Sequence, residues 1–128
     1  MRALLDTHVL LWIASDESKL TNKAKKLVVN AEVELFCSMA SLWEMSIKIS
    51  LQKLTLPTSL ARFVDDEILG NNIALLGIKP AHTYLVAQLP FHHRDPFDRL
   101  LIAQAMQEKL HLVSADPKMD HYSIKRYW

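Results

Sequence analysis

The sequence predicts an α/β fold, in which helices cover both faces of a mainly parallel sheet. Three observations favour this fold. Short apolar runs alternate with stretches whose apolar residues recur at helical spacing, as in successive strand–helix units. Half of the 128 residues are hydrophobic, which is enough to bury a core and excludes a disordered chain. Only two glycines and five prolines occur, without a repeat or a linker-like stretch, so residues 1–128 are predicted to form one domain.

The first strand and the first two helices follow from the local pattern. Residues 2–6 form a short buried strand that ends at Asp6, and residues 7–15 continue as a helix. Thr21 caps an amphipathic helix over residues 21–31, whose lysines lie mostly on a solvated face.

The middle of the chain contains a second strand and two further helices. Residues 33–38 form the strand, and Ser38 begins the helix that follows it. Another helix spans residues 58–70, with Thr58 as its cap and Gly70 where it stops.

The last third contains the remaining strands and two more helices. They are a strand at 73–78, a helix at 80–89, a helix at 95–106, a strand at 110–116 and an edge strand at 124–128. Because strands and helices alternate throughout, the sheet is expected to be mainly parallel.

The stretch HHRDPFDRLLIAQA contains two aspartates just before an apolar helical pattern. Asp95 is suited to the N-cap of that helix, and Pro96 to its first position, where the missing N–H is not needed. Asp98 then falls in the first turn, where the helix dipole favours a carboxylate. Capping alone explains both acids, so any further role must be supported by residues elsewhere.

The composition limits the class of protein. Fifteen Lys and Arg against fourteen Asp and Glu give a formal charge of +1, which lacks the overall basic charge of a strong nucleic-acid binder but allows a local patch. Cys37 is the single cysteine, which excludes a disulfide framework and a cysteine zinc cluster. The first residues lack the apolar stretch of a signal peptide and no segment has the length of a membrane span, so we expect a cytoplasmic protein.

Four acids that are far apart in the sequence are expected at one edge of the sheet. They are Asp6 after the first strand, Glu44 in the helix after the second, Asp98 in the first turn of its helix, and Asp116 after the fourth strand. Ligands of such sheets bind beyond the carboxyl ends of the strands. Each acid also has a purely structural explanation. Asp6 and Asp116 are suited to helix caps, and Glu44 to a capping box with Ser41 or an ion pair with Lys48.

Clustered carboxylates repel one another and therefore tend to protonate or to bind cations. Oxygen ligands without cysteine favour a hard ion such as Mg²⁺ or Mn²⁺ over zinc. Such an ion can polarise a phosphoryl oxygen and lower the pKa of a bound water, so phosphodiester hydrolysis is the chemistry that this cluster predicts.

Several basic residues flank the acids. Lys48, Arg94 and Arg99 are candidates for contacts with substrate phosphates, or each pairs with a neighbouring carboxylate. Adjacent histidines in an extended chain point apart, so His92 and His93 are not expected to bind one metal ion together. Both are expected in a solvated loop, and contact with RNA is a second possibility.

The stretches LLDTHVLLW, SLWEMSIK, DPFDRLLIAQA and LVSAD occur in this order between Arg2 and Asp116. Together they resemble the four acidic blocks of the PIN-domain nucleases, and more closely those of VapC-like toxins of bacterial type II toxin–antitoxin pairs. The resemblance implies a three-layer α/β/α domain and a Mg²⁺- or Mn²⁺-dependent endoribonuclease that cleaves RNA. It also implies a cognate antitoxin that blocks the site, and a homodimer, alone or within that complex.

The resemblance further implies the roles of individual residues. It makes four acids the catalytic and metal-binding residues: Asp6, Glu44, Asp98 and Asp116. Asp95 is then the extra acid, a helix cap with an outer-sphere role left open. Thr7 beside Asp6 and Ser114 beside Asp116 are supporting residues. His8 departs from the asparagine of many members, and Met119 from a frequent aromatic residue.

Other interpretations remain. An aspartyl phosphatase needs a second aspartate two residues after the first, where this chain has His8, and a phosphoacceptor receiver domain needs paired acids after the first strand. A non-catalytic binding module whose acids only cap helices comes from a different class. Saturable Mn²⁺ binding that depends on Asp6 distinguishes the enzyme from the module.

Overall fold

The computed structural model describes residues 1–128, and its centre is a five-stranded sheet in which all neighbouring strands are parallel. The strand order is β3-β2-β1-β4-β5. The strands are β1 (Arg2–Leu5), β2 (Glu34–Ser38), β3 (Ile73–Leu76), β4 (His111–Val113) and β5 (Arg126–Tyr127). The predicted parallel sheet is confirmed, including the C-terminal edge strand.

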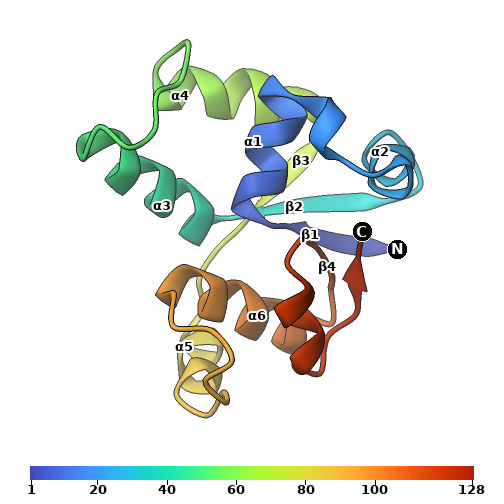
Figure 1. Ribbon diagram of the computed structural model, residues 1–128, viewed down its shortest axis with the longest axis vertical. Helices are drawn as coiled ribbons and strands as arrows, with labels where there is room; N and C mark the ends of the chain where they lie inside the picture. The colour runs from blue at the N-terminus through green and yellow to red at the C-terminus, as the bar shows by residue number, and fades with distance from the viewer.

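Six α-helices connect and cover these strands. They are α1 (Thr7–Ser15), α2 (Asn22–Val28), α3 (Met39–Ser50), α4 (Leu60–Phe63), α5 (Pro80–Val86) and α6 (Pro96–Glu108). Figure 1 shows α1, α2 and α4 on one side of the sheet and α5 and α6 on the other. Helix α3 contacts both α1 and α6. The predicted three-layer α/β/α architecture is therefore present, and no helix is long and apolar enough to cross a bilayer.

The central strand β1 supplies side chains to both cores. Ala3 and Leu5 belong to the core beneath α1 and α2, whereas Leu4 belongs to the core beneath α6. All three are fully buried. Successive strand residues point to opposite faces, so an uninterrupted apolar run is what a strand with helices on both faces requires.

The helix boundaries follow local capping in most places. The side chains of Thr21, Ser38 and Asp95 cap their helices as predicted. The helix predicted from Thr58 is corrected, because the hydroxyl of Ser59 accepts the backbone N–H of Arg62, at 3.1 Å, and so acts as the cap. That segment continues after α4 through η2 (Val64–Ile68) and η3 (Leu69–Asn71) and stops at Asn72, not Gly70.

The parallel arrangement brings the carboxyl ends of β1, β2 and β4 to one edge. Leu5 is paired with Cys37 on one side and with Val113 on the other. The residues that directly follow these three positions therefore lie next to one another. The first and the last of them are more than 100 positions apart in the sequence. This edge contains the predicted site.

Candidate active site

Asp6 lies at the carboxyl end of β1 and caps α1. Its side chain accepts the backbone N–H of His8 at 3.4 Å and the hydroxyl of Ser114 at 2.7 Å. The residue is buried, and burial raises the pKa of its carboxyl, an effect that the Ser114 hydrogen bond only partly offsets. The nearby charge of Glu44 raises the pKa of Asp6 further.

Glu44 lies in the second turn of α3 and is also buried. Lys48, one turn further along the helix, forms an ion pair with it at 2.8 Å. The predicted capping box of Glu44 with Ser41 is absent, because Ser38 caps α3 and the Ser41 hydroxyl accepts that of Thr7 at 2.8 Å. Thr7 therefore joins α1 to α3.

Asp95 and Asp98 have different environments although both lie at the start of α6. The Asp95 carboxylate accepts the backbone N–H groups of Phe97 at 2.8 Å and of Asp98 at 3.0 Å, which makes it the cap. Burial, followed by the charges of Asp95 and Asp6, raises the pKa of Asp98 to about 7. The charge of Glu44 contributes in the same direction. Asp98 therefore lies near Asp6 and Glu44, within a common negative field.

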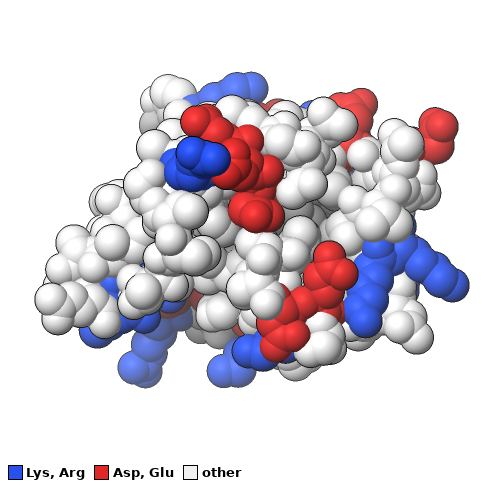
Figure 2. All heavy atoms as spheres, turned by 90° about the horizontal axis from the view of Figure 1, so that it is seen from above, with Lys and Arg blue, Asp and Glu red and all other residues white.

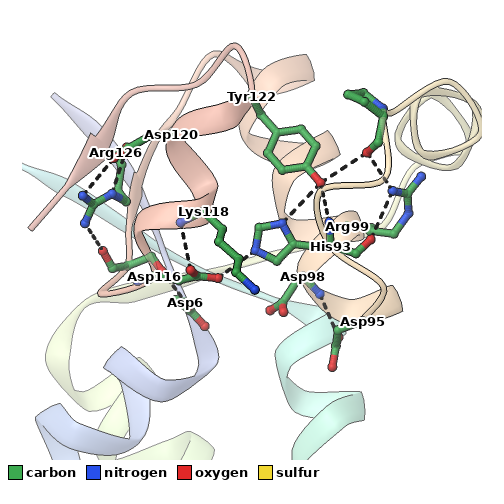
Figure 3. A network of polar contacts seen from close by, with 12 residues as sticks. Asp6, His93, Asp95, Asp98, Arg99, Asp116, Lys118, Asp120, Tyr122 and Arg126 are labelled. Carbon is green, nitrogen blue, oxygen red and sulfur yellow. Dashed lines mark hydrogen bonds and ion pairs between the residues drawn. The ribbon is translucent and has the colours of Figure 1, made fainter.

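Asp116 completes this edge of the sheet and caps the short helix η4 (Pro117–His121). Its Oδ1 accepts the backbone N–H of Lys118 at 2.9 Å, and its own N–H donates to the Ser114 hydroxyl at 3.1 Å. Burial raises the pKa of Asp116, but hydrogen bonds from His93 and from the Lys118 backbone more than offset this, so that the net pKa is lowered. Since the Ser114 hydroxyl donates to Asp6, it bridges the first and fourth acids, which lie close together in Figure 3.

The sequence model of the PIN domain matches residues 3–125. The chain belongs to the PIN domain family. The chain is 26% identical over 117 residues to Ribonuclease VapC22 of Mycobacterium tuberculosis (strain ATCC 25618 / H37Rv), which covers 91% of this chain and 88% of the relative.

Solved structures of low sequence identity share this PIN domain fold. The structure of VapBC2 from Rickettsia felis, bound to a DNA fragment from their promoter, matches with a TM-score of 0.72 at 14% identity and full coverage of both chains. FitAcB from Neisseria gonorrhoeae matches with a TM-score of 0.67 at 16% identity, over 98% of this chain and 96% of that chain. The family and the fold that the sequence motifs implied are therefore confirmed.

One residue of this PIN domain was placed wrongly by the sequence. His93, expected in a solvated loop, is buried with 7% of its surface exposed, and its Nε2 lies 2.7 Å from Oδ2 of Asp116. Its neighbour His92 is exposed, as expected. No local pattern distinguishes the two, because the partners that bury His93 lie more than 20 residues away.

The expectation that Arg99 contacts substrate phosphate is also corrected. The guanidinium is buried and donates to four backbone carbonyls, of Val86, Leu89, Pro90 and His93, at 3.0 to 3.4 Å. The exposed ring of Phe91 lies 4.1 Å from it. Arg99 therefore fastens the loop before α6, with both terminal nitrogens of its guanidinium bound to backbone carbonyls.

Lys48 and Arg94, the other two candidate phosphate contacts of the PIN domain, lie near the acids. Lys48 lies close enough to Asp95 and Asp98 for their charges to raise its pKa, after the larger effect of its hydrogen bond to Glu44. Arg94 is exposed in the loop before α6. Figure 2 shows small separate groups of acidic and basic side chains on one face, in keeping with the formal charge of +1.

The chemistry of the acids fits a hard divalent cation. The charges of Asp95, Asp6 and Glu44 all raise the pKa of Asp98, and neither Asp98 nor Asp6 forms an ion pair with a cationic side chain. As the side chains stand, no group of three or more His, Cys, Asp or Glu residues is placed to hold one metal ion. Mg²⁺ usually binds one or two carboxylates and keeps several waters, so an open arrangement with excess negative charge suits it.

Proposed function

We propose that this PIN domain is a metal-dependent endoribonuclease that hydrolyses RNA phosphodiester bonds and acts in the cytoplasm as the toxin of a toxin–antitoxin pair. The main observation is the environment of Asp98, whose pKa is raised to about 7 by burial and then by the charges of Asp95, Asp6 and Glu44, which come from other elements or from the cap of its own helix. The likeness to Ribonuclease VapC22 supports this activity. The likeness to VapBC2 and FitAcB supports the toxin assignment.

In this proposal Asp6, Glu44 and Asp98 hold Mg²⁺ or Mn²⁺, and Asp116 completes the set directly or through water. When bound, the ion polarises a phosphoryl oxygen and acidifies water, which is the chemistry that phosphodiester hydrolysis needs. The protein keeps its carboxylates oriented. Ser114 fixes Asp6, and the Asp95 cap fixes the first turn that contains Asp98.

Lys48 and Arg94 are the basic residues that we assign to the RNA backbone. Lys48 is partly exposed beside Glu44, and Arg94 is exposed next to the first turn of α6. Positive charge at this position both attracts phosphate and offsets the repulsion between RNA and the acids.

A cognate antitoxin and a second copy of the chain are the proposed protein partners. The structures of similar fold, VapBC2 and FitAcB, support the first assignment. For the second, the surface near the site is apolar, since Trp43 has 59% of its surface exposed and packs edge-on against Phe97 at 5.2 Å between ring centres. Exposed aromatic surface of this kind is typical of protein interfaces.

The test is cleavage of a pool of single-stranded and structured RNA by purified protein, with Mg²⁺, with Mn²⁺ and with EDTA. The variants are Asp6→Asn and Asp98→Asn, and Asp65→Asn is the matched control, because Asp65 is exposed in η2. We expect metal-dependent cutting by the parent and the control, and none by the site variants.

Two results would contradict the proposal. Equal cutting by folded, metal-supplied Asp98→Asn would remove the acid cluster from the reaction. No cutting by the parent, together with no saturable Mn²⁺ binding, would instead support a non-catalytic PIN-like module whose acids only cap helices.

A further inference from the structure

His93 occupies a buried position at the edge of the acid cluster. It belongs to the loop between α5 and α6, and its imidazole lies beside both Asp116 and Asp98 (Figure 3). A histidine buried in a core is often satisfied by core partners alone. Here one ring nitrogen instead contacts a carboxylate whose side chain is 34% exposed.

Both ring nitrogens of His93 have a partner. Nε2 lies 2.7 Å from Oδ2 of Asp116, and Nδ1 lies 3.2 Å from the hydroxyl of Tyr122. The same hydroxyl accepts the backbone N–H of His93 at 3.0 Å and lies 3.3 Å from the carbonyl of Pro90. Tyr122 therefore fixes the imidazole and its backbone together, which sets the direction of Nε2.

The loop that holds His93 is fastened to the helix that contains Asp98. The Arg99 guanidinium donates to the carbonyl of His93 at 3.4 Å and to that of Pro90 at 3.0 Å. Since Arg99 follows Asp98 directly in the first turn of α6, the positions of His93 and Asp98 are coupled through one buried side chain.

The contact between His93 and Asp116 is not needed for helix capping. Capping of η4 is performed by Oδ1 of Asp116, which accepts the Lys118 N–H, whereas His93 contacts Oδ2. A carboxylate oxygen has two lone pairs, so Oδ2 keeps one available for water or a cation while the imidazole fixes its direction. Hydrogen-bond partners behind a ligand of this kind typically change metal affinity or activity by about 10- to 100-fold.

We propose that His93, held by Tyr122, is a positioning residue that orients the Asp116 carboxylate toward the cation and substrate of this site. The proposal rests on the nuclease function proposed above. It assigns to His93 no contact with substrate and no part in bond cleavage. Its effect passes through Asp116.

The experiment compares two substitutions that separate packing from hydrogen bonding. His93→Phe keeps a planar ring but has no donor for Asp116, whereas His93→Gln keeps a donor but loses the ring. Mn²⁺ affinity is measured by calorimetry at constant pH, RNA cleavage is resolved into kcat and KM, and thermal unfolding is followed in EDTA. Asp65→Asn, exposed in η2, is again the control, because the ring of the adjacent His92 packs against Tyr122 at 5.1 Å between ring centres.

We expect His93→Phe to bind Mn²⁺ about 10- to 100-fold more weakly and to lose kcat, with His93→Gln restoring much of both. Tyr122→Phe should produce a smaller loss of the same kind. In the Asp116→Asn background, His93→Phe should have no additional effect, because the residue through which it acts is already changed.

Three outcomes would overturn the proposal. Mn²⁺ affinity within twofold of the parent for His93→Phe would show that the ring only packs. Independent, additive losses in the double variant would show that His93 does not act through Asp116. A parent protein that neither binds Mn²⁺ nor cleaves RNA would refute the proposed function and this inference together. The first two outcomes differ from this one, because both are observed with a parent protein that is active.

Discussion

Replacement of Asp98 by asparagine should stabilise the metal-free protein. The pKa of this carboxyl is raised from 3.8 to about 7 by burial and by the charges of Asp95 and Asp6. Between these pH values the folded state retains a proton that the unfolded state has lost. The free energy of unfolding therefore falls as the pH rises from about 4 to about 7, and asparagine removes this loss.

The size of the effect follows from the same difference. Each unit of pKa difference between the folded and unfolded states is worth about 1.4 kcal/mol. A rise in the pKa of Asp98 from 3.8 to about 7 therefore corresponds to roughly 4 kcal/mol in the free energy of unfolding before solvent screening is included. Because the side chain is only partly buried, solvent screens much of this, and we expect about 1 to 2 kcal/mol. For a domain of this size that is an increase in Tm of roughly 3 to 8 °C.

The assay is thermal unfolding of the parent and of Asp98→Asn in EDTA, at pH 8 and at pH 4. The variant should be more stable at pH 8, and the difference should shrink at pH 4, where the parent carboxyl is protonated in the folded state. Added Mn²⁺ should raise the Tm of the parent but raise that of the variant much less. An Asp98→Asn protein that is no more stable than the parent at pH 8 would refute the reasoning.

Two further variants test the first turn of α6. Arg99→Lys should lower the free energy of unfolding by about 2 to 4 kcal/mol, because one ammonium group cannot reach the four carbonyls that the planar guanidinium binds. Urea unfolding measures this, and a loss below 1 kcal/mol would show that the loop is held by other contacts. Asp95→Ala should cost about 1 kcal/mol through the lost cap, whereas Asp95→Asn should keep both stability and metal-dependent cleavage. A folded Asp95→Asn protein that cannot cleave RNA would make Asp95 part of the site.

Local interactions explain why much of this fold follows from the sequence. An N-cap such as Ser38 or Asp95 bonds to N–H groups two or three residues away, so the signal lies within one short stretch. The Thr58 error shows the limit of such signals, since Thr58 and Ser59 are both good caps and only the path of the backbone selects the second. The apolar runs predicted the strands for the same local reason.

The candidate acids were also accessible from the sequence, because Asp6 and Asp116 follow predicted strands, whereas Glu44 and Asp98 lie in the first two turns of predicted helices. The rule for parallel sheets then assigns them to one edge, even though the sequence does not give the strand order. In the structure, the charges of Asp6 and Glu44 both raise the pKa of Asp98, and the Ser114 hydroxyl links the Asp6 carboxylate to the backbone N–H of Asp116.

The sequence by itself determined the α/β class, the alternation of strands and helices, most caps and the four acids, since these depend on periodicity and on neighbours along the chain. Only the tertiary structure decided that His93 is buried while His92 is exposed, and that Arg99 holds a loop. Both outcomes depend on groups distant in sequence, the Tyr122 hydroxyl for His93 and the backbone carbonyls from Val86 onward for Arg99. A buried polar side chain needs partners in fixed positions, and those positions exist only once the sheet and both helix layers are assembled.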